Sequence, residues 1–258
     1  MSRISIIHYL KLVFRSCLFL ITLIMYVLSV IKGKTDLFTD ISQSKILFAV
    51  WLIFVVEMIF RSFPSKFESM GCQKQFKRNY KPTDKGNVTV GRKSDKSIVV
   101  VAILWILLNG IIGVLYYMGV FDKGILVLIS LAFSVCDMIC ILFFCPFQTW
   151  IMKNKCCTSC RIYNWDYAMM FTPMIFITDF FAQSLWIFAV ILLLRWEITA
   201  HIHPEYFSES ENSCLSCTEC KEKLCHHKKQ LLHFLNVNKK RLHVKGNDLL
   251  QKINHKQK

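Results

Sequence analysis

The chain has few glycines and acidic residues, and it lacks the common motifs of soluble enzymes. Its 258 residues include 9 Gly and 17 Asp and Glu, against 32 Lys and Arg. Neither Gly-x-Gly-x-x-Gly nor the phosphate loop Gly-x-x-x-x-Gly-Lys-Ser/Thr is present. A Gly-x-Ser-x-Gly elbow and a His-Glu-x-x-His pair are also missing. These absences argue against a nucleotide enzyme and leave open whether the protein is an enzyme at all.

The excess of basic residues gives a formal net charge of +15. Nucleic-acid-binding segments interleave basic residues with aromatic residues that stack on bases, and the Lys- and Arg-rich segments here lack such a stripe. We therefore expect no nucleic-acid partner. In a chain with long apolar runs, the positive charge instead orients the membrane spans and attracts anionic lipid. Membrane lipid is thus the first partner that the composition predicts.

Long hydrophobic runs are the most prominent feature that is present. Hydrophobic residues make up 54% of the chain, and its mean hydropathy is +0.40. A window of about 19 residues finds five apolar segments, at about Tyr9–Ile31, Ile46–Phe63, Ile98–Val120, Ile125–Phe144 and Tyr167–Leu194. The first segment ends without a small-residue cleavage site, so we expect it to remain as a span and not to be removed as a signal peptide.

These segments predict an all-α, polytopic membrane protein with about five transmembrane helices and a Cys-rich polar C-terminal tail. Residues 1–63 form two N-terminal transmembrane helices, residues 64–97 a basic cytoplasmic loop, and residues 98–150 a transmembrane hairpin. Residues 151–166 form a Cys-rich cytoplasmic loop, residues 167–196 a fifth transmembrane segment, and residues 197–258 a tail rich in Cys, His and Lys. We expect the protein in the plasma membrane as a multi-pass protein.

Orientation follows from the basic residues that flank the spans. Residues 61–97 contain ten Lys and Arg against three acids, which predicts that this loop is cytoplasmic. We expect the fifth segment to cross once, because its twenty-eight residues are too few for two crossings of about 20 residues each. The tail then lies outside. In the alternative, Pro173 and Asp179 break this segment, and the tail returns to the cytoplasm.

The strongest chemical motif is a group of closely spaced thiols in the tail. It comprises Cys214, Cys217, Cys220 and Cys225, and His226 and His227 follow directly. The first three cysteines recur every three residues and resemble the run that wraps an iron–sulfur cluster in bacterial ferredoxins, although the last spacer is one residue longer. The same set suits tetrahedral zinc, or disulfides in an oxidising compartment. The cofactor therefore stays undecided between an iron–sulfur cluster and zinc.

A second group of thiols lies between the fourth and fifth segments. Its members are Cys145, Cys156, Cys157 and Cys160. The Cys157-x-x-Cys160 spacing is typical of shared metal coordination or dithiol chemistry, and palmitoylated or inert cysteines are the alternative. Cys140-x4-Cys145-Pro146 at the end of a span resembles the membrane ferredoxin-type electron-transfer proteins, in which Gly follows soon after the proline where this chain has Gln148. Cys136 and Cys140 themselves are expected to be small packing residues.

Three acidic residues interrupt the apolar segments: Glu57, Asp137 and Asp179. Charged side chains inside a membrane are costly and often mark a path for ions or protons. The alternative is that these acids lie at the membrane interface or are paired with Lys11, Arg15 or Asn109. Asn164 and Asp166 are expected to cap the helix that follows them.

Three functions are consistent with these patterns. The first is a redox membrane protein, in which cysteine-ligated metal sites exchange electrons with a protein partner. The second is a zinc-stabilised membrane scaffold, sensor or assembly factor in which no electrons move. The third is a small ion-coupled transporter that uses the intramembrane acids, although the segments show no inverted repeat.

Overall fold

The computed structural model describes residues 3–32, 45–65, 68–83, 95–153 and 160–216. Within these ranges the chain is helical and contains no strand, which confirms the all-α prediction. The long helices are α1 (Arg3–Ile31), α3 (Lys45–Arg61), α5 (Asp95–Tyr117), α6 (Lys123–Leu142) and α8 (Phe180–Ile202). Short helices lie between them and after α8, namely α4 (Met70–Gln73), η1 (Lys77–Asn79), η2 (Phe147–Ile151), η3 (Arg161–Trp165), α7 (Asp166–Phe171), η4 (Thr172–Phe176), η5 (Pro204–Phe207) and η6 (Ser213–Leu215).

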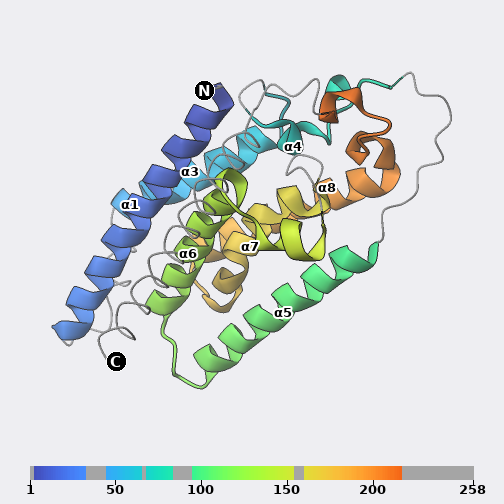
Figure 1. Cartoon of the computed structure of the whole chain (residues 1–258). Helices are drawn as coiled ribbons and strands as arrows, with labels where there is room; N and C mark the ends of the chain where they lie inside the picture. The colour runs from blue at the N-terminus through green and yellow to red at the C-terminus, as the bar shows by residue number, and fades with distance from the viewer. Residues whose placement is uncertain (1–2, 33–44, 66–67, 84–94, 154–159, 217–258) are drawn as a thin grey trace, which may run out of the picture.

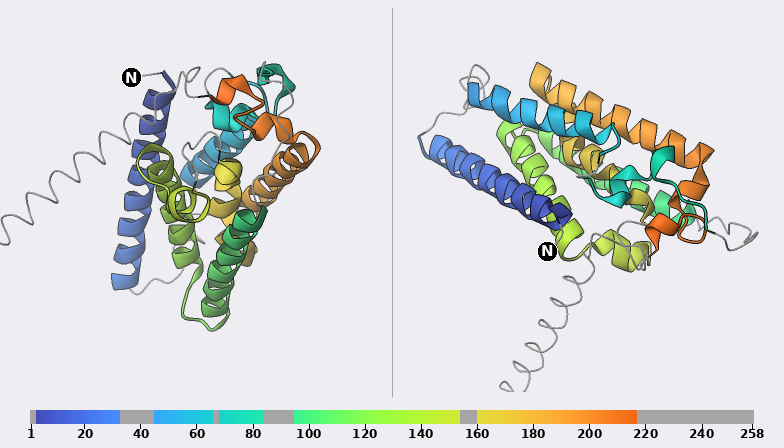
Figure 2. Two further views of the ribbon diagram at one scale, coloured as in Figure 1. Left: turned by 45° about the vertical axis from the view of Figure 1, so that its right-hand side comes forward. Right: turned by 90° about the horizontal axis from the view of Figure 1, so that it is seen from above.

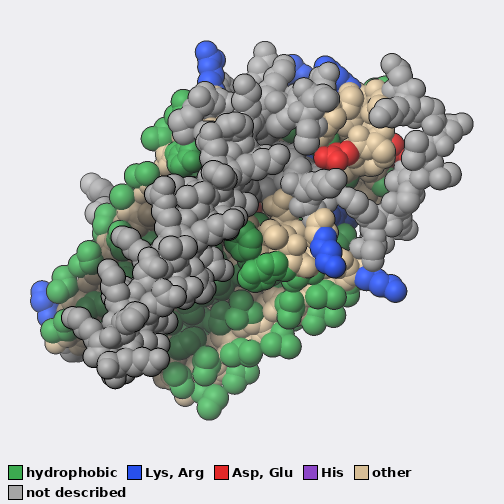
Figure 3. Space-filling model, in the orientation of Figure 1, with side chains coloured by type: hydrophobic (Ala, Val, Ile, Leu, Met, Phe, Trp, Pro, Cys, Tyr) green, Lys and Arg blue, Asp and Glu red, His purple; other side chains and the backbone are tan. Residues whose placement is uncertain are grey.

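Four of these helices, α1, α5, α6 and α8, are long and apolar enough to cross a membrane. The fifth predicted span, α3, has 17 residues. At about 1.5 Å per residue it is about 26 Å long, slightly less than the hydrocarbon core of about 30 Å. Hydrophobic side chains cover the surface over α1 and α5 (Figure 3). An apolar surface of this kind is stable against lipid, not against water.

The helices have a common polar end and a common distal end. At the polar end, Tyr9 near the start of α1 contacts Phe143 just after α6, with ring centroids 6.3 Å apart. At the distal end, the Tyr26 hydroxyl near the end of α1 donates to Asp122, which also caps α6 by accepting from the Ile125 N–H. The helices α1 and α6 therefore run antiparallel and lie side by side (Figure 1).

The predicted fifth segment is broken: α7 and η4 precede Asp179, and α8 follows it. Its polar-end residue Asp166 pairs with Arg61 at the end of α3, whereas Asp179 lies 3.9 Å from Lys123 at the distal end. Helices α7 and η4 thus run through the bundle, and α8 returns beside α3 (Figure 2). Pro173 has no N–H and clashes with a continuing α-helix, so the chain tightens into η4. A 3₁₀-helix and an extended segment each advance further per residue than an α-helix. Fewer residues are therefore needed to pass from the polar end to the distal end.

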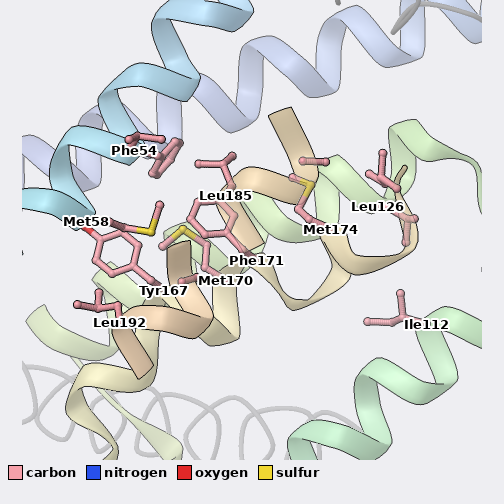
Figure 4. Close-up of a cluster of buried hydrophobic side chains, with 14 residues drawn as sticks. Phe54, Met58, Ile112, Leu126, Tyr167, Met170, Phe171, Met174, Leu185 and Leu192 are labelled. Carbon is pink, nitrogen blue, oxygen red and sulfur yellow. The ribbon is translucent and has the colours of Figure 1, made fainter. Parts of the chain in front are cut away.

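The broken segment forms the centre of the core. Tyr167, Met170, Phe171 and Met174 recur at helical spacing, and all are buried (Figure 4). They pack against α3 and α8, where the rings of Phe54 and Phe171 meet edge to face with centroids 5.3 Å apart. This core fixes the residues at the start of α7 relative to the other helices.

The start of the tail lies at the polar end. Residues after α8 contact the segment that follows α3, where Pro82 and Asn212 form an isolated antiparallel bridge. The Ser213 N–H donates to the Lys81 carbonyl at 2.9 Å, and the rings of Tyr80 and Tyr206 are 5.1 Å apart. Residues 204–216 therefore lie at the same end of the bundle as the segment that follows α3.

This topology predicts which lysines share a membrane face. In sealed vesicles of one orientation, an impermeant amine reagent should label Lys77 and Lys81 together, or Lys123 alone, because these exposed residues lie at opposite ends. A Glu209→Lys variant places an amine in the exposed start of the tail, and it should label with Lys77 and Lys81. Peptide mass spectrometry measures each site. Labelling of residue 209 together with Lys123 would contradict the topology.

Candidate functional site

Arg15 is the centre of a buried charged network. Its guanidinium donates to Glu57 on α3 at 3.2 Å and to Asp137 on α6 at 3.1 Å. It also donates to the Ser134 carbonyl at 3.2 Å, and only 1% of Arg15 is exposed. A lone charge inside a bilayer is costly, and here each charge faces an opposite one.

Lys11 and Tyr167 extend this network toward the polar end. The Lys11 ammonium is 3.5 Å from both Glu57 and Glu68. The Tyr167 hydroxyl donates to Glu57 at 2.9 Å. Glu57 and Asp137 are thus paired with Lys11 and Arg15, as the alternative to a polar path predicted.

A second buried pair joins α3 to the start of α7. Arg61 donates to Asp166 and, at 3.1 Å, to the side-chain oxygen of Asn164. The Arg61 guanidinium also lies over the Tyr167 ring, 5.0 Å from its centroid. Asn164 and Asp166 were expected to cap a helix, but α7 starts without a side-chain cap, and both residues bind Arg61 instead. The second carboxylate oxygen of Asp166, Oδ1, is buried and has no hydrogen-bond partner among the residues that the structure describes.

The three intramembrane acids do not line one continuous path. Asp179 pairs with Lys123, the first residue of α6, and both side chains are exposed. Asp137 lies fourteen residues further along α6, which at 1.5 Å per residue is about 21 Å away. The arrangement of these acids therefore does not favour the transporter hypothesis.

Glu68 and Cys72 lie just outside the spans, next to this network. Burial alone would raise the pKa of the Glu68 carboxyl, but the positive charges of Lys11 and Arg61 lower this pKa by a larger amount. The net result is a pKa below the ordinary 4.5. Burial raises the pKa of the Cys72 thiol to about 12. Cys72 is therefore a neutral packing residue and a poor metal ligand or nucleophile.

A cavity of about 120 Å³ lies between α5, α6 and the short helices η2, η3 and α7. Four cysteines line it: Cys136, Cys140, Cys145 and Cys160. Two of them, Cys136 and Cys140, are one turn apart on α6, whereas Cys145 follows α6 and Cys160 directly precedes η3. The fold thus brings sulfur atoms from three segments to one place.

Two of these sulfur atoms are in contact. The side chains of Cys140 and Cys145 are hydrogen-bonded to each other. The Gln148 N–H donates to the Cys145 sulfur at 3.4 Å, which holds that side chain against η2. The helix break at Pro146 permits this contact, because the chain turns back after α6 ends at Leu142.

The remaining walls of the cavity are mostly apolar, with a few polar groups. Aromatic and thioether side chains form most of the lining, namely Trp105, Phe133, Phe147, Tyr163, Met169 and Met170. The carboxyl groups of Asp137 and Asp166 also line it, so the cavity adjoins the charged network. Ligand sites typically have such walls, with few polar groups to orient the ligand.

Of the predicted metal ligands that the structure describes, two line the cavity and one does not. Cys145 and Cys160 line the same cavity, as their grouping implies. Cys214 is in η6, donates its N–H to Asn212, and does not line this cavity. Five other predicted ligands lie outside the described residues, namely Cys156, Cys157, Cys217, Cys220 and Cys225. Among the residues that the structure describes, no three His, Cys, Asp or Glu side chains are arranged to hold a metal ion.

Sequence reasoning missed part of this site. Cys136 and Cys140 were assigned to packing, yet their helical spacing and their closeness to Cys145 could have grouped them with the second set. Arg61 was counted only among the basic residues of the 61–97 loop, and Tyr167 only as the start of the fifth apolar segment. No sequence signal pairs these two residues with Asp166 and Glu57, because the contacts join segments more than a hundred residues apart.

Comparison of the chain with protein-family models, curated proteins and solved structures finds no match. The functional argument therefore depends on the geometry of the site.

The Arg15 network predicts a large loss of stability in an Arg15→Gln variant. The change leaves the carboxylates of Glu57 and Asp137 without their central partner, and breaking a buried ion pair typically costs about 3–5 kcal/mol. Unfolding of the detergent-solubilised protein in sodium dodecyl sulfate measures the free energy. Lys32→Gln, at the exposed end of α1, is the matched control. An equally small effect of both changes would contradict the central role of Arg15.

Glu68 predicts a specific pH dependence of stability. Because its folded-state pKa is below 4.5, the carboxylate stabilises the fold above that pH, and this contribution disappears as the pH falls through the folded value. Glu68→Gln should therefore lower the free energy of unfolding at neutral pH and have little effect in strong acid. Glu209→Gln, at an exposed position, should show no such difference. A Glu68→Gln effect that is constant with pH would refute this assignment.

Proposed function

We propose that the chain is a multi-pass plasma-membrane protein with a cysteine-ligated metal centre, and that this centre is an iron–sulfur cluster that transfers electrons. The proposed ligands are the two predicted groups: Cys145, Cys156, Cys157 and Cys160, and Cys214, Cys217, Cys220 and Cys225. One observation carries the proposal. Cys145 and Cys160 are fifteen residues apart in the sequence and line the same cavity.

The position of the tail supports this proposal. The Trp196 side chain near the end of α8 donates to the Arg161 carbonyl at 3.2 Å, next to Cys160. Glu197 accepts from Arg161 at 2.7 Å and from the Trp165 side chain at 2.7 Å. These contacts bring the start of the tail to the same end of the bundle as the second cysteine group. Cys160 and Cys214, one from each group, therefore lie at the same end of the bundle.

The compartment expected for the polar end also supports a metal centre. The loop of residues 61–97, with its ten basic residues, marks the polar end as cytoplasmic under the positive-inside rule. Cytosolic thiols are kept reduced, which favours metal ligation over structural disulfides.

The zinc-stabilised scaffold is the second candidate. The CxxC spacings and the adjacent His226 and His227 suit tetrahedral zinc as well as iron. In this case the metal folds the polar segments, and no electrons move. The two candidates differ in colour and in redox behaviour.

Metal analysis of anaerobically purified full-length protein tests the proposal. We expect stoichiometric iron and sulfide, with a visible absorption that bleaches with dithionite. Cys160→Ser and Cys217→Ser should each lower the metal content, because each removes a thiolate ligand. Cys17→Ser is the matched control, since Cys17 lies on α1 away from both groups. Colourless protein with stoichiometric zinc would support the scaffold, and metal-free protein would overturn both candidates.

A further inference from the structure

A surface residue of α6 connects the cysteine-lined cavity to the outside of the bundle. Cys136 lines the cavity and is itself exposed on α6. It lies six residues before the end of α6, which corresponds to about 9 Å of helix. On the opposite wall, Trp105 of α5 precedes Ile106, which is 70% exposed on the apolar surface of that helix. A molecule that enters beside Cys136 therefore comes from the hydrocarbon region.

The size of the cavity fits one small ring. Its volume is about 120 Å³, and an engineered apolar cavity of about 150 Å³ in another protein binds benzene. Trp105, Phe133 and Phe147 provide aromatic walls against which a planar ring can stack. A ring head group with an apolar tail fits this cavity, because the tail can extend past Cys136 into the lipid.

The inner wall of the cavity carries thiol groups that can reduce a bound molecule. The hydrogen-bonded pair of Cys140 and Cys145 forms a dithiol, and two adjacent thiols can give up two electrons by forming a disulfide. Asp166 also lines the cavity, and its buried Oδ1 atom has no hydrogen-bond partner within the described part of the chain. That oxygen can accept a hydrogen bond from a hydroxyl group on a ring.

From these three observations we infer that the cavity binds a lipid-soluble quinone, which the Cys140–Cys145 dithiol reduces to the quinol. The two S–H bonds break and one S–S bond forms. The two electrons and two protons that the thiols lose are gained by the two quinone oxygens. Asp166 Oδ1 is a positioning group that accepts a hydrogen bond from a quinol hydroxyl. Repeated turnover requires a protein dithiol that reduces the disulfide from the aqueous side, where Cys145 lies beyond the end of α6.

This inference goes beyond the proposed metal centre and does not rest on it. Cys145 is common to both proposals, because the disulfide consumes a thiol that is also a proposed metal ligand. Cys140 belongs to neither ligand group, whereas Cys217 is a proposed ligand that takes no part in the dithiol reaction. Cys140→Ser and Cys217→Ser therefore separate the two proposals.

Stoichiometric reduction of decylubiquinone tests the inference. Full-length protein is reduced with dithiothreitol, desalted anaerobically and mixed with the quinone. We expect one quinol formed and two thiols lost per protein, with a Cys140–Cys145 disulfide identified by peptide mass spectrometry. Cys140→Ser should abolish quinol formation, whereas Cys17→Ser, on α1 and outside the lining of the cavity, should retain it. No quinol formation by the wild-type protein, or quinol formation that survives Cys140→Ser, overturns the inference.

A variant at the opening tests binding separately from folding. Cys136→Trp places a bulky side chain at the lipid-facing entrance and should strongly slow quinol formation. The dithiol of this variant should still be oxidised by diamide, a small water-soluble oxidant, which shows that the fold and the thiols are intact. In the wild-type protein, decylubiquinone should slow the labelling of Cys136 by a maleimide. Unchanged labelling, or full quinone reduction by Cys136→Trp, would contradict a site in this cavity.

The proposed metal centre predicts a different pattern of quinol formation among the variants in the same assay. Quinol formation that is lost with the metal in Cys217→Ser and retained in Cys140→Ser would assign the electrons to the metal centre. This result would overturn the dithiol reaction and support the proposed function. Metal-free protein that still forms the Cys140–Cys145 disulfide with the quinone would support the dithiol reaction and overturn the proposed metal centre.

Discussion

The pairing of Arg15 with Glu57 and Asp137 is the interaction on which the rest of the fold depends. A guanidinium that is 1% exposed within an apolar bundle requires counter-charges at hydrogen-bond distance. Because the three residues come from α1, α3 and α6, this requirement fixes the rotation of all three helices together. Apolar packing alone specifies rotation weakly in lipid, where hydrocarbon tails are as apolar as the side chains they meet. The ion pairs therefore supply specificity that the apolar faces cannot.

The same network positions the cavity. One carboxylate oxygen of Asp137 accepts from Arg15, and one of Asp166 accepts from Arg61. Both aspartates also line the cavity. The break at Pro173 is the second requirement, because it lets the start of α7 lie at the polar end while the chain still reaches the distal end before α8. Charged residues that the fold already needs and cysteines from three segments thus line the same cavity.

Two chemical schemes share this cavity, and both follow from the convergence of sulfur. Metal ligation needs thiolates from the cavity and from the polar segments around it, whereas the dithiol reaction needs Cys140 and Cys145 alone. Their common element is an apolar surround that adjoins the lipid on one side and the polar end on the other. A site in this position can exchange electrons between a membrane-soluble carrier and an aqueous partner, whichever sulfur chemistry performs the step.

The sequence by itself determined the helical class, the approximate positions of the long helices and the need to pair Lys11 and Arg15 with intramembrane acids. These features are local: apolar length, helical spacing and the cost of a charge in lipid are all readable along the chain. The tertiary structure alone decided that residues 166–202 pass through the bundle twice, that Arg61 holds Asp166, and that Cys136 and Cys140 join Cys145 and Cys160 around one cavity. Such contacts depend on the rotation and crossing of helices far apart in the sequence, and hydrophobic periodicity does not encode which partner an individual side chain meets.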